Sequence, residues 1–262
     1  MFLALVLSAS AGDHTNWFKP TSLSNDSAAL VTDDAWARDE VAKVKVSVEN
    51  KTGEYLVYDM SQSVGTFGDQ QIHPEGGLLK GTLVLDAKDS GSRVLEFQGA
   101  GLHVDGFDVD FKGLRVGTGT TNVDAPEFVL PEAANSFEAG DFSCALAGVK
   151  KKTQETLADF KCTYEGDGLG LITANRAAVR VDGVEGQEFA NDNKKAKTKT
   201  LLPGESVKIS LLFHVPAKIS DMQFATMYIV WGDTFQSVAL QDVDMGSISV
   251  ALDAGVTAAK NE

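Results

Sequence analysis

The chain has 262 residues, 43% of them hydrophobic and 23% charged, and its formal net charge is −14. That apolar share can build a packed core, which excludes an intrinsically disordered chain. The acidic balance leaves no basic footprint for nucleic acid, and no apolar run reaches the roughly 20 residues of a membrane-spanning helix. We therefore expect one large or two smaller globular domains, with no nucleic-acid partner and no transmembrane segment.

The first residues have the pattern of a secretory signal. Residues 1–7 are apolar, and the small residues after them place Ala9 and Ala11 at the spacing of a cleavage site. We predict a signal peptide over residues 1–11 and an exported chain, secreted or periplasmic. The polar residues 12–34 are expected to form a flexible N-terminal segment.

Residues 35–42 follow Thr32 and Asp33, which can cap a helix, and we expect one or two helical turns there. From Val44 onward apolar and polar residues alternate, as in half-buried strands. Further short strands are expected around residues 55–58, 83–85, 93–97, 107–111, 178–181, 207–213, 227–231 and 248–252. Many short strands separated by turns predict an all-β protein of the sandwich type.

The two cysteines, Cys144 and Cys162, lie in strand-like segments on either side of a polar stretch near residues 150–155. A hairpin centred near Thr153 would place them opposite each other. A loop of this length contributes about 3 kcal/mol in the chain-entropy estimate. Because an even number of cysteines in an exported chain favours a bridge, we predict a Cys144–Cys162 disulfide.

The chain also shows signs of an internal repeat. Three pairs of positions are 116 residues apart, namely Phe97 and Phe213, Asp105 and Asp221, and Lys45 and Lys161. Two further pairs, Leu85 with Leu202 and Phe107 with Phe224, are 117 apart. The near-constant offset predicts two copies of one β-sandwich over residues 35–120 and 136–252, with a linker over 121–135 and a tail over 253–262. The alternative is one large sandwich whose strands share a period.

A turn at Pro203, Gly204 and Glu205 precedes a strand that ends in Phe213, His214, Val215 and Pro216. This pattern resembles the telokin-like, immunoglobulin-like domains of bacterial exported proteins, over residues 158–232 with a fainter echo in 44–112. The corresponding turn of the first copy, residues 88–91, lacks the proline. The resemblance implies two tandem immunoglobulin-like β-sandwiches that serve in binding or assembly, and it implies no active site.

The strongest metal candidates are His103, Asp105, Asp108 and Asp110. In an extended strand His103 and Asp105 share one face, as do Asp108 and Asp110, so that a cation with oxygen ligands could bind there. The alternative is that Asp108 and Asp110 form the solvated face opposite Phe107, Val109 and Phe111. The four histidines, at positions 14, 73, 103 and 214, have no zinc-site spacing. We expect neither a metal nor another cofactor.

Nucleophile motifs are weak in this sequence. It contains no Gly-x-Ser-x-Gly pattern, and too little chain precedes Ser90 for a chymotrypsin-like order of catalytic residues. We predict no catalytic residues. The expected function is an exported, non-catalytic binding or structural module that recognises an unknown protein or glycan through loops or a sheet edge. The alternatives are a hydrolase with a loop-borne carboxylate site and a Ca²⁺-stabilised adhesion domain.

Overall fold

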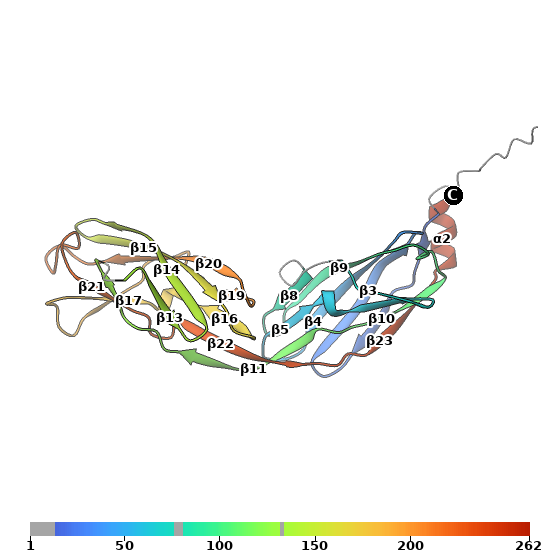
Figure 1. The fold of residues 1–262 in the computed structure, drawn as a ribbon, viewed down its shortest axis with the longest axis horizontal. Helices are drawn as coiled ribbons and strands as arrows, with labels where there is room; N and C mark the ends of the chain where they lie inside the picture. The colour runs from blue at the N-terminus through green and yellow to red at the C-terminus, as the bar shows by residue number, and fades with distance from the viewer. Residues whose placement is uncertain (1–13, 76–80, 132–133) are drawn as a thin grey trace, which may run out of the picture. The chain divides into compact units, whose positions relative to one another are not determined.

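The computed structural model describes residues 14–75, 81–131 and 134–262, so the signal peptide predicted over residues 1–11 lies outside the described residues. The described chain is all-β, as predicted, with several antiparallel sheets and a short C-terminal helix (Figure 1). It divides into two compact units. Unit 1 comprises residues 1–116 and 241–262, and unit 2 comprises residues 117–240.

Unit 1 contains a five-stranded sheet, a four-stranded sheet and a shorter arrangement of strands. The first joins β1, β3, β4 and β9, with β2 beside β3; the second has the order β23, β10, β6, β7; the third has β8, β5 and the start of β11. The strands are β1 (Asn16–Trp17), β2 (Thr21–Ser24), β3 (Ala28–Ala37), β4 (Val41–Asn50), β5 (Leu56–Asp59), β6 (Val64–Phe67), β7 (Gln70–Ile72), β8 (Thr82–Leu85), β9 (Ser90–Gln98), β10 (Gly106–Asp110), β23 (Ser247–Ala251) and the first three residues of β11 (Leu114–Val123), whose remainder belongs to unit 2.

Unit 2 is also built from antiparallel strands. One sheet has the order β13, β14, β15, β20; another has β12, β21, β17, β18; and β16 lies between β19 and β22. The strands are β12 (Phe128–Leu130), β13 (Ser136–Ala139), β14 (Phe142–Lys151), β15 (Glu155–Tyr164), β16 (Leu169–Ile172), β17 (Ala178–Val181), β18 (Glu188–Ala190), β19 (Lys199–Leu201), β20 (Ser206–His214), β21 (Met227–Val230) and β22 (Phe235–Asp242).

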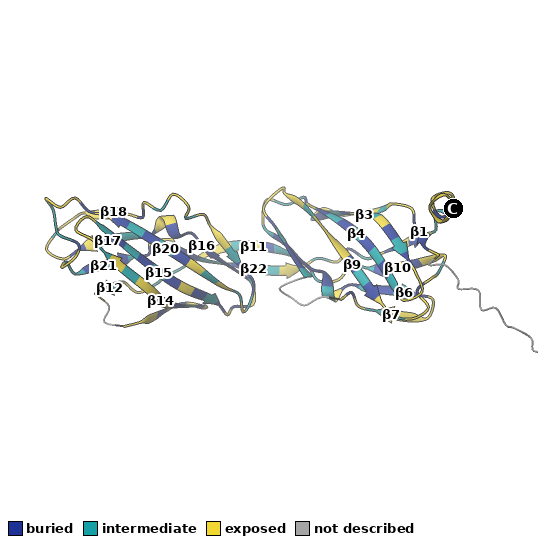
Figure 2. Ribbon diagram, turned by 90° about the horizontal axis from the view of Figure 1, so that it is seen from above, coloured by how far each residue is buried: buried dark blue, intermediate teal, exposed yellow. Residues whose placement is uncertain are grey.

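Each unit has its own hydrophobic core, which follows from the alternation along its strands. Val44, Val46 and Val48 of β4 are buried and the residues between them are more exposed, as Figure 2 shows along this strand. In unit 2 the core is rich in aromatic rings. Phe137 stacks on Trp231 with 4.7 Å between ring centroids, and Phe160 meets Trp231 edge to face.

The predicted disulfide is confirmed. Cys144 and Cys162 are directly opposite in the β14–β15 hairpin, both are fully buried, and their sulfur atoms are bonded. The turn of the hairpin lies between Lys151 and Glu155, where the sequence predicted it. The bridge therefore ties two adjacent strands in the core of unit 2.

The prediction of helical turns over residues 35–42 is wrong. β3 continues to Ala37, the chain turns with a hydrogen bond from the N–H of Arg38 to the C=O of Val41, and β4 begins at Val41. Ala35 and Ala37 of β3 are buried and Trp36 between them is partly exposed, so burial alternates with a period of two. Burial against the opposite sheet outweighs the local capping signal of the residues before the segment.

The ends of the chain also differ from expectation. Residues 14–34, expected to be flexible, form β1, β2 and most of β3, and the expected tail contains α2 (Ala254–Asn261), capped by the Asp253 carboxylate. The side chain of Asn261 hydrogen-bonds both the N–H and the C=O of Thr15, and the N–H of Trp17 donates to Thr257 Oγ1. The helix and β1 thus hold each other, which the order of residues alone does not reveal.

The predicted domain limits differ from the compact units at both boundaries. β12 lies within the expected linker and pairs with β21 of unit 2. β23, expected in the second sandwich, pairs over five residues with β10 of unit 1. Contacts between strands far apart in the chain set these limits, so composition along the chain does not reveal them.

Candidate functional site

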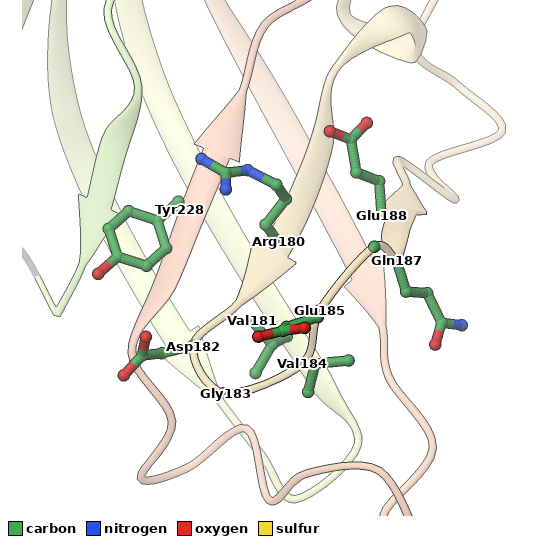
Figure 3. A pocket seen from close by; sticks show the side chains of 10 residues that line it. Arg180, Val181, Asp182, Gly183, Val184, Glu185, Gln187, Glu188 and Tyr228 are labelled. Carbon is green, nitrogen blue, oxygen red and sulfur yellow. The ribbon is translucent and has the colours of Figure 1, made fainter.

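A pocket of about 760 Å³ lies on unit 2 at the loop of residues 182–187, where β17 ends and β18 begins, beside the start of β21 (Figure 3). The lining side chains are mostly polar or charged, with an aromatic ring on one side. The lining residues are Arg180, Val181, Asp182, Gly183, Val184, Glu185, Gly186, Gln187, Glu188 and Tyr228. Gly183 and Gly186 have positive φ angles of 74° and 68°, which glycine adopts without strain, so the loop can turn tightly around the pocket.

Three side chains form a row across the outer face of this sheet. Arg180 is paired in register with Glu188 of β18 on one side and with Tyr228 of β21 on the other. Their sequence neighbours Val179, Met227 and Ile229 are buried, so strand alternation turns the three polar residues outward. We call this row the Glu188–Arg180–Tyr228 ladder; Figure 3 shows Arg180 between the other two side chains.

Arg180 is held in place by two further contacts. Its guanidinium hydrogen-bonds the carboxylate of Glu127, and its Cζ lies 5.6 Å from the centre of the Tyr228 ring, within cation–π range. Because Glu127 already neutralises Arg180, the carboxylates of Asp182, Glu185 and Glu188 give the pocket a negative balance. This arrangement offers hydrogen-bond acceptors beside an aromatic face. Its lining residues, all within the described chain, include no histidine, cysteine or serine for nucleophilic chemistry.

The four residues proposed from sequence as a cation site do not converge. Asp108 accepts a hydrogen bond from Ser249 Oγ at 2.5 Å, and Asp110 forms an ion pair with Lys112 at 3.1 Å. Phe107, Val109 and Phe111 are buried on the opposite side, as the alternative interpretation predicted. Within residues 14–75, 81–131 and 134–262, no group of three or more histidine, cysteine, aspartate and glutamate side chains is placed to hold a metal.

His103 instead contacts His14, a residue that sequence analysis did not select. His14 Nδ1 lies 3.0 Å from His103 Nε2, and both residues are exposed. The two positions are 89 residues apart in the chain, so spacing rules for metal motifs could not find them. From the sequence alone, the only indication is that His14 lies in a polar segment near the N-terminus and that His103 lies near a turn.

A second histidine, His214, lies between two carboxylates. Its Nδ1 is 3.1 Å from Asp192 and its Nε2 is 3.3 Å from Glu155, which also accepts a hydrogen bond from Lys152. The Lys152 hydrogen bond, together with His214, holds the pKa of Glu155 below its ordinary value. Since both ring nitrogens face carboxylates, His214 is not placed to activate a hydroxyl nucleophile as in a catalytic triad.

The carboxylate of Asp159 in β15 provides a test of pH-dependent stability. Burial raises the pKa of Asp159, but the hydrogen bond from Ser210 and the charge of Lys208 together lower it below its ordinary value. A depressed pKa stabilises the fold above the unfolded pKa, and this stabilisation is lost as the pH falls through the folded pKa. Ser210→Ala should therefore lower the free energy of unfolding by about 1 kcal/mol at neutral pH and by less in acid.

Urea unfolding at neutral pH and at about pH 3 measures this difference. Ser206→Ala is the matched control, because Ser206 lies on the same strand and its hydroxyl pairs with Thr163 rather than with a carboxylate. A Ser210→Ala deficit of equal size at both pH values contradicts the assignment to Asp159.

The fold and the pocket define an all-β protein with a polar surface site on one of two compact units. No protein-family model matches the chain, and no curated protein matches it. In the described part of the chain, no helix has the length and apolar content needed to cross a membrane.

Solved structures show only distant likeness. They include the secreted serine protease VesC from Vibrio cholerae, with 12% identity, a TM-score of 0.20, and coverage of 78% of this chain and 48% of that one. Red sea bream transglutaminase has 9% identity and a TM-score of 0.22, over 87% of this chain and 31% of that one. The infectious bursal disease virus Gx strain structure has 13% identity and a TM-score of 0.20, over 92% and 72%. The chain spans about half the length of the protease and a third of the transglutaminase, and the low scores carry no functional argument.

Proposed function

We propose that this chain is an exported, non-catalytic binding module made of two tandem immunoglobulin-like β-sandwiches, which engages a glycan through the pocket of unit 2. The observation that carries the binding role is the Glu188–Arg180–Tyr228 ladder at the edge of a polar pocket. Export is supported by the buried disulfide, since such bridges persist in oxidising compartments. The resemblance of the Pro203–Glu205 turn and its strand to telokin-like domains supports the same compartment and fold.

The correspondence of elements supports a duplication. β4 and β15 are both ten residues long and begin 155 − 41 = 114 residues apart; β6 and β17 begin 178 − 64 = 114 apart. β9 and β20 begin 206 − 90 = 116 apart, the offset that the sequence showed for Phe97 and Phe213. The neighbours also match, because β4 lies between β3 and β9 as β15 lies between β14 and β20. Equivalent strands in equivalent order favour two copies over one undivided sandwich.

The two copies would also exchange their last strands. β12, which follows β11 in the chain, pairs with β21 of unit 2, whereas β23, which follows β22, pairs with β10 of unit 1. β12 and β23 thus have the same place in both the repeat and the sheet, but each lies in the other unit. An exchange of this kind accounts for a unit 1 built from two separate stretches of chain.

The composition of the pocket favours a hydroxyl-rich, uncharged glycan. The half-buried Tyr228 ring offers an apolar face for a sugar ring, while Asp182, Glu185, Glu188 and Gln187 offer groups that bond hydroxyls. The negative balance disfavours anionic ligands, because burying two like charges together is costly. A protein partner and a hydrolase are the competing outcomes of the test below.

Tyr228→Ala should weaken binding of whichever neutral glycan the protein selects on a printed glycan array by at least about tenfold, or about 1.4 kcal/mol. The substitution removes the aromatic face of Tyr228 and leaves the buried residues Met227 and Ile229 beside it unchanged. The matched control is Phe224→Ala, since Phe224 is 84% exposed on the same unit and does not line the pocket. Titration calorimetry with the selected oligosaccharide measures the change.

Three outcomes oppose the proposal. If the wild-type protein retains no glycan, the pocket has another occupant. If both alanine variants weaken binding equally, the contact lies outside the pocket. If mass spectrometry shows that the oligosaccharide is shortened after incubation, the hydrolase alternative replaces the binding module.

A further inference from the structure

The geometry points to a metal site at the N-terminal end of unit 1, in which His14 Nδ1 and His103 Nε2 bind one Cu²⁺ ion. The two nitrogens are 3.0 Å apart, and the rings are at 89° with centroids 5.1 Å apart. The imidazoles therefore meet nitrogen to nitrogen and do not stack. Both residues are exposed, so an ion can reach them from solvent.

The separation of the nitrogens suits two ligands of a single ion. With metal–nitrogen bonds of about 2.0–2.1 Å, two nitrogens at right angles are about 2.9 Å apart, and at the tetrahedral angle about 3.4 Å. The observed 3.0 Å lies within this interval. Without metal, the facing N–H of one ring donates a hydrogen bond to the other ring; on binding, that proton shifts to the far nitrogen of its own ring, so that both facing lone pairs are free for the ion.

The main chain on both sides of the pair is held in place. Thr15, next to His14, is hydrogen-bonded through its backbone by the side chain of Asn261, and the side chain of Asn16 donates to the C=O of Val104. The N–H of Leu102 donates to the C=O of Asp39, and the C=O of Asp105 accepts from the N–H of Leu252. Since the neighbours of both histidines are fixed, little ordering remains for metal binding.

Copper is the preferred ion because imidazole suits it and because Cu²⁺ has the highest affinity among the divalent first-row metals. The pair supplies two ligands, and the described residues place no third histidine, cysteine or carboxylate with them. The remaining positions would be filled by water.

Copper titration of the wild-type protein and of its His14→Ala and His103→Ala variants tests the pair. CuSO₄ is added at neutral pH, and calorimetry and the visible absorption of the Cu²⁺ complex are recorded. His73→Ala is the control, because His73 Nδ1 is engaged by the backbone C=O of Ser63.

We expect one Cu²⁺ per chain in the wild-type protein, at least about tenfold weaker binding for His14→Ala and for His103→Ala, and no change for His73→Ala. Undiminished affinity of the folded His103→Ala variant, checked by circular dichroism, overturns the site.

Discussion

A chain that ends at Leu240 is expected to lose the fold of unit 1 while unit 2 remains folded. The deletion removes β23 and α2, and with them Met245, Ile248 and Val250, which are buried in the core of unit 1. Burial of each such side chain contributes about 1.5–3 kcal/mol, so their sum approaches the whole stability of a small domain. β10 also loses the partner strand along its residues Gly106–Asp110.

Amide hydrogen exchange of the truncated chain measures this effect for each strand. Protection should be lost in β6 and β10 and retained in β15 and β20, because residues 117–240 form one continuous stretch of chain. Protection of β10 equal to that in the full chain would show that β23 is dispensable.

A milder pair of variants gives the same information if the truncated chain aggregates. Val250→Asp places a charge in the core of unit 1, whereas Ala251→Asp places it on the exposed side of the same strand. Only the first should destabilise unit 1 strongly, since an unpaired buried charge is costly. Equal effects of the two variants contradict the arrangement of β23.

The second large effect is expected from the disulfide. Replacing Cys144 by serine should lower the free energy of unfolding of unit 2 by about 3 kcal/mol, because the unfolded chain is no longer closed into a loop between positions 18 residues apart. The serine hydroxyl in a fully buried position adds to this cost. Denaturant unfolding under oxidising conditions, monitored by the fluorescence of Trp231, reports the change.

The same measurement in reductant provides the control for this prediction. The wild-type protein and a Cys144→Ala, Cys162→Ala double variant should then have nearly the same stability, since neither has a covalent bridge. An unaltered unfolding transition of Cys144→Ser under oxidising conditions contradicts a stabilising role for the bridge.

Much of the fold was predictable because it depends on local alternation. The burial of Val44, Val46 and Val48 follows from a period of two, and the pairing of Cys144 with Cys162 follows from the symmetry of a short hairpin. The turn at Gly204, with φ of 79°, follows from residues that favour it. The sequence predicts helical turns over residues 35–42 because Thr32 and Asp33 can cap a helix and the alanines that follow have no pronounced strand signal.

The candidate sites were less predictable, because each depends on residues that meet across strands. Arg180, Glu188 and Tyr228 lie side by side only once the register of β17, β18 and β21 is set. His14 and His103 are brought together by β1, α2 and the turn before β10. A single sequence does not show which distant strands pair or in which register they do so.

By itself, then, the amino-acid order determined that this protein is built from short strands with one apolar side, joined in part by a hairpin that aligns its two cysteines. Only the tertiary structure decided that β23 completes unit 1 and β12 completes unit 2, and which charged and aromatic side chains share an outer face. The physical reason is the distance along the chain over which the interactions act. Hydrophobic alternation and turn formation depend on residues near in sequence. Strand pairing depends on the apolar surface that two strands bury together, even when a long stretch of chain separates them.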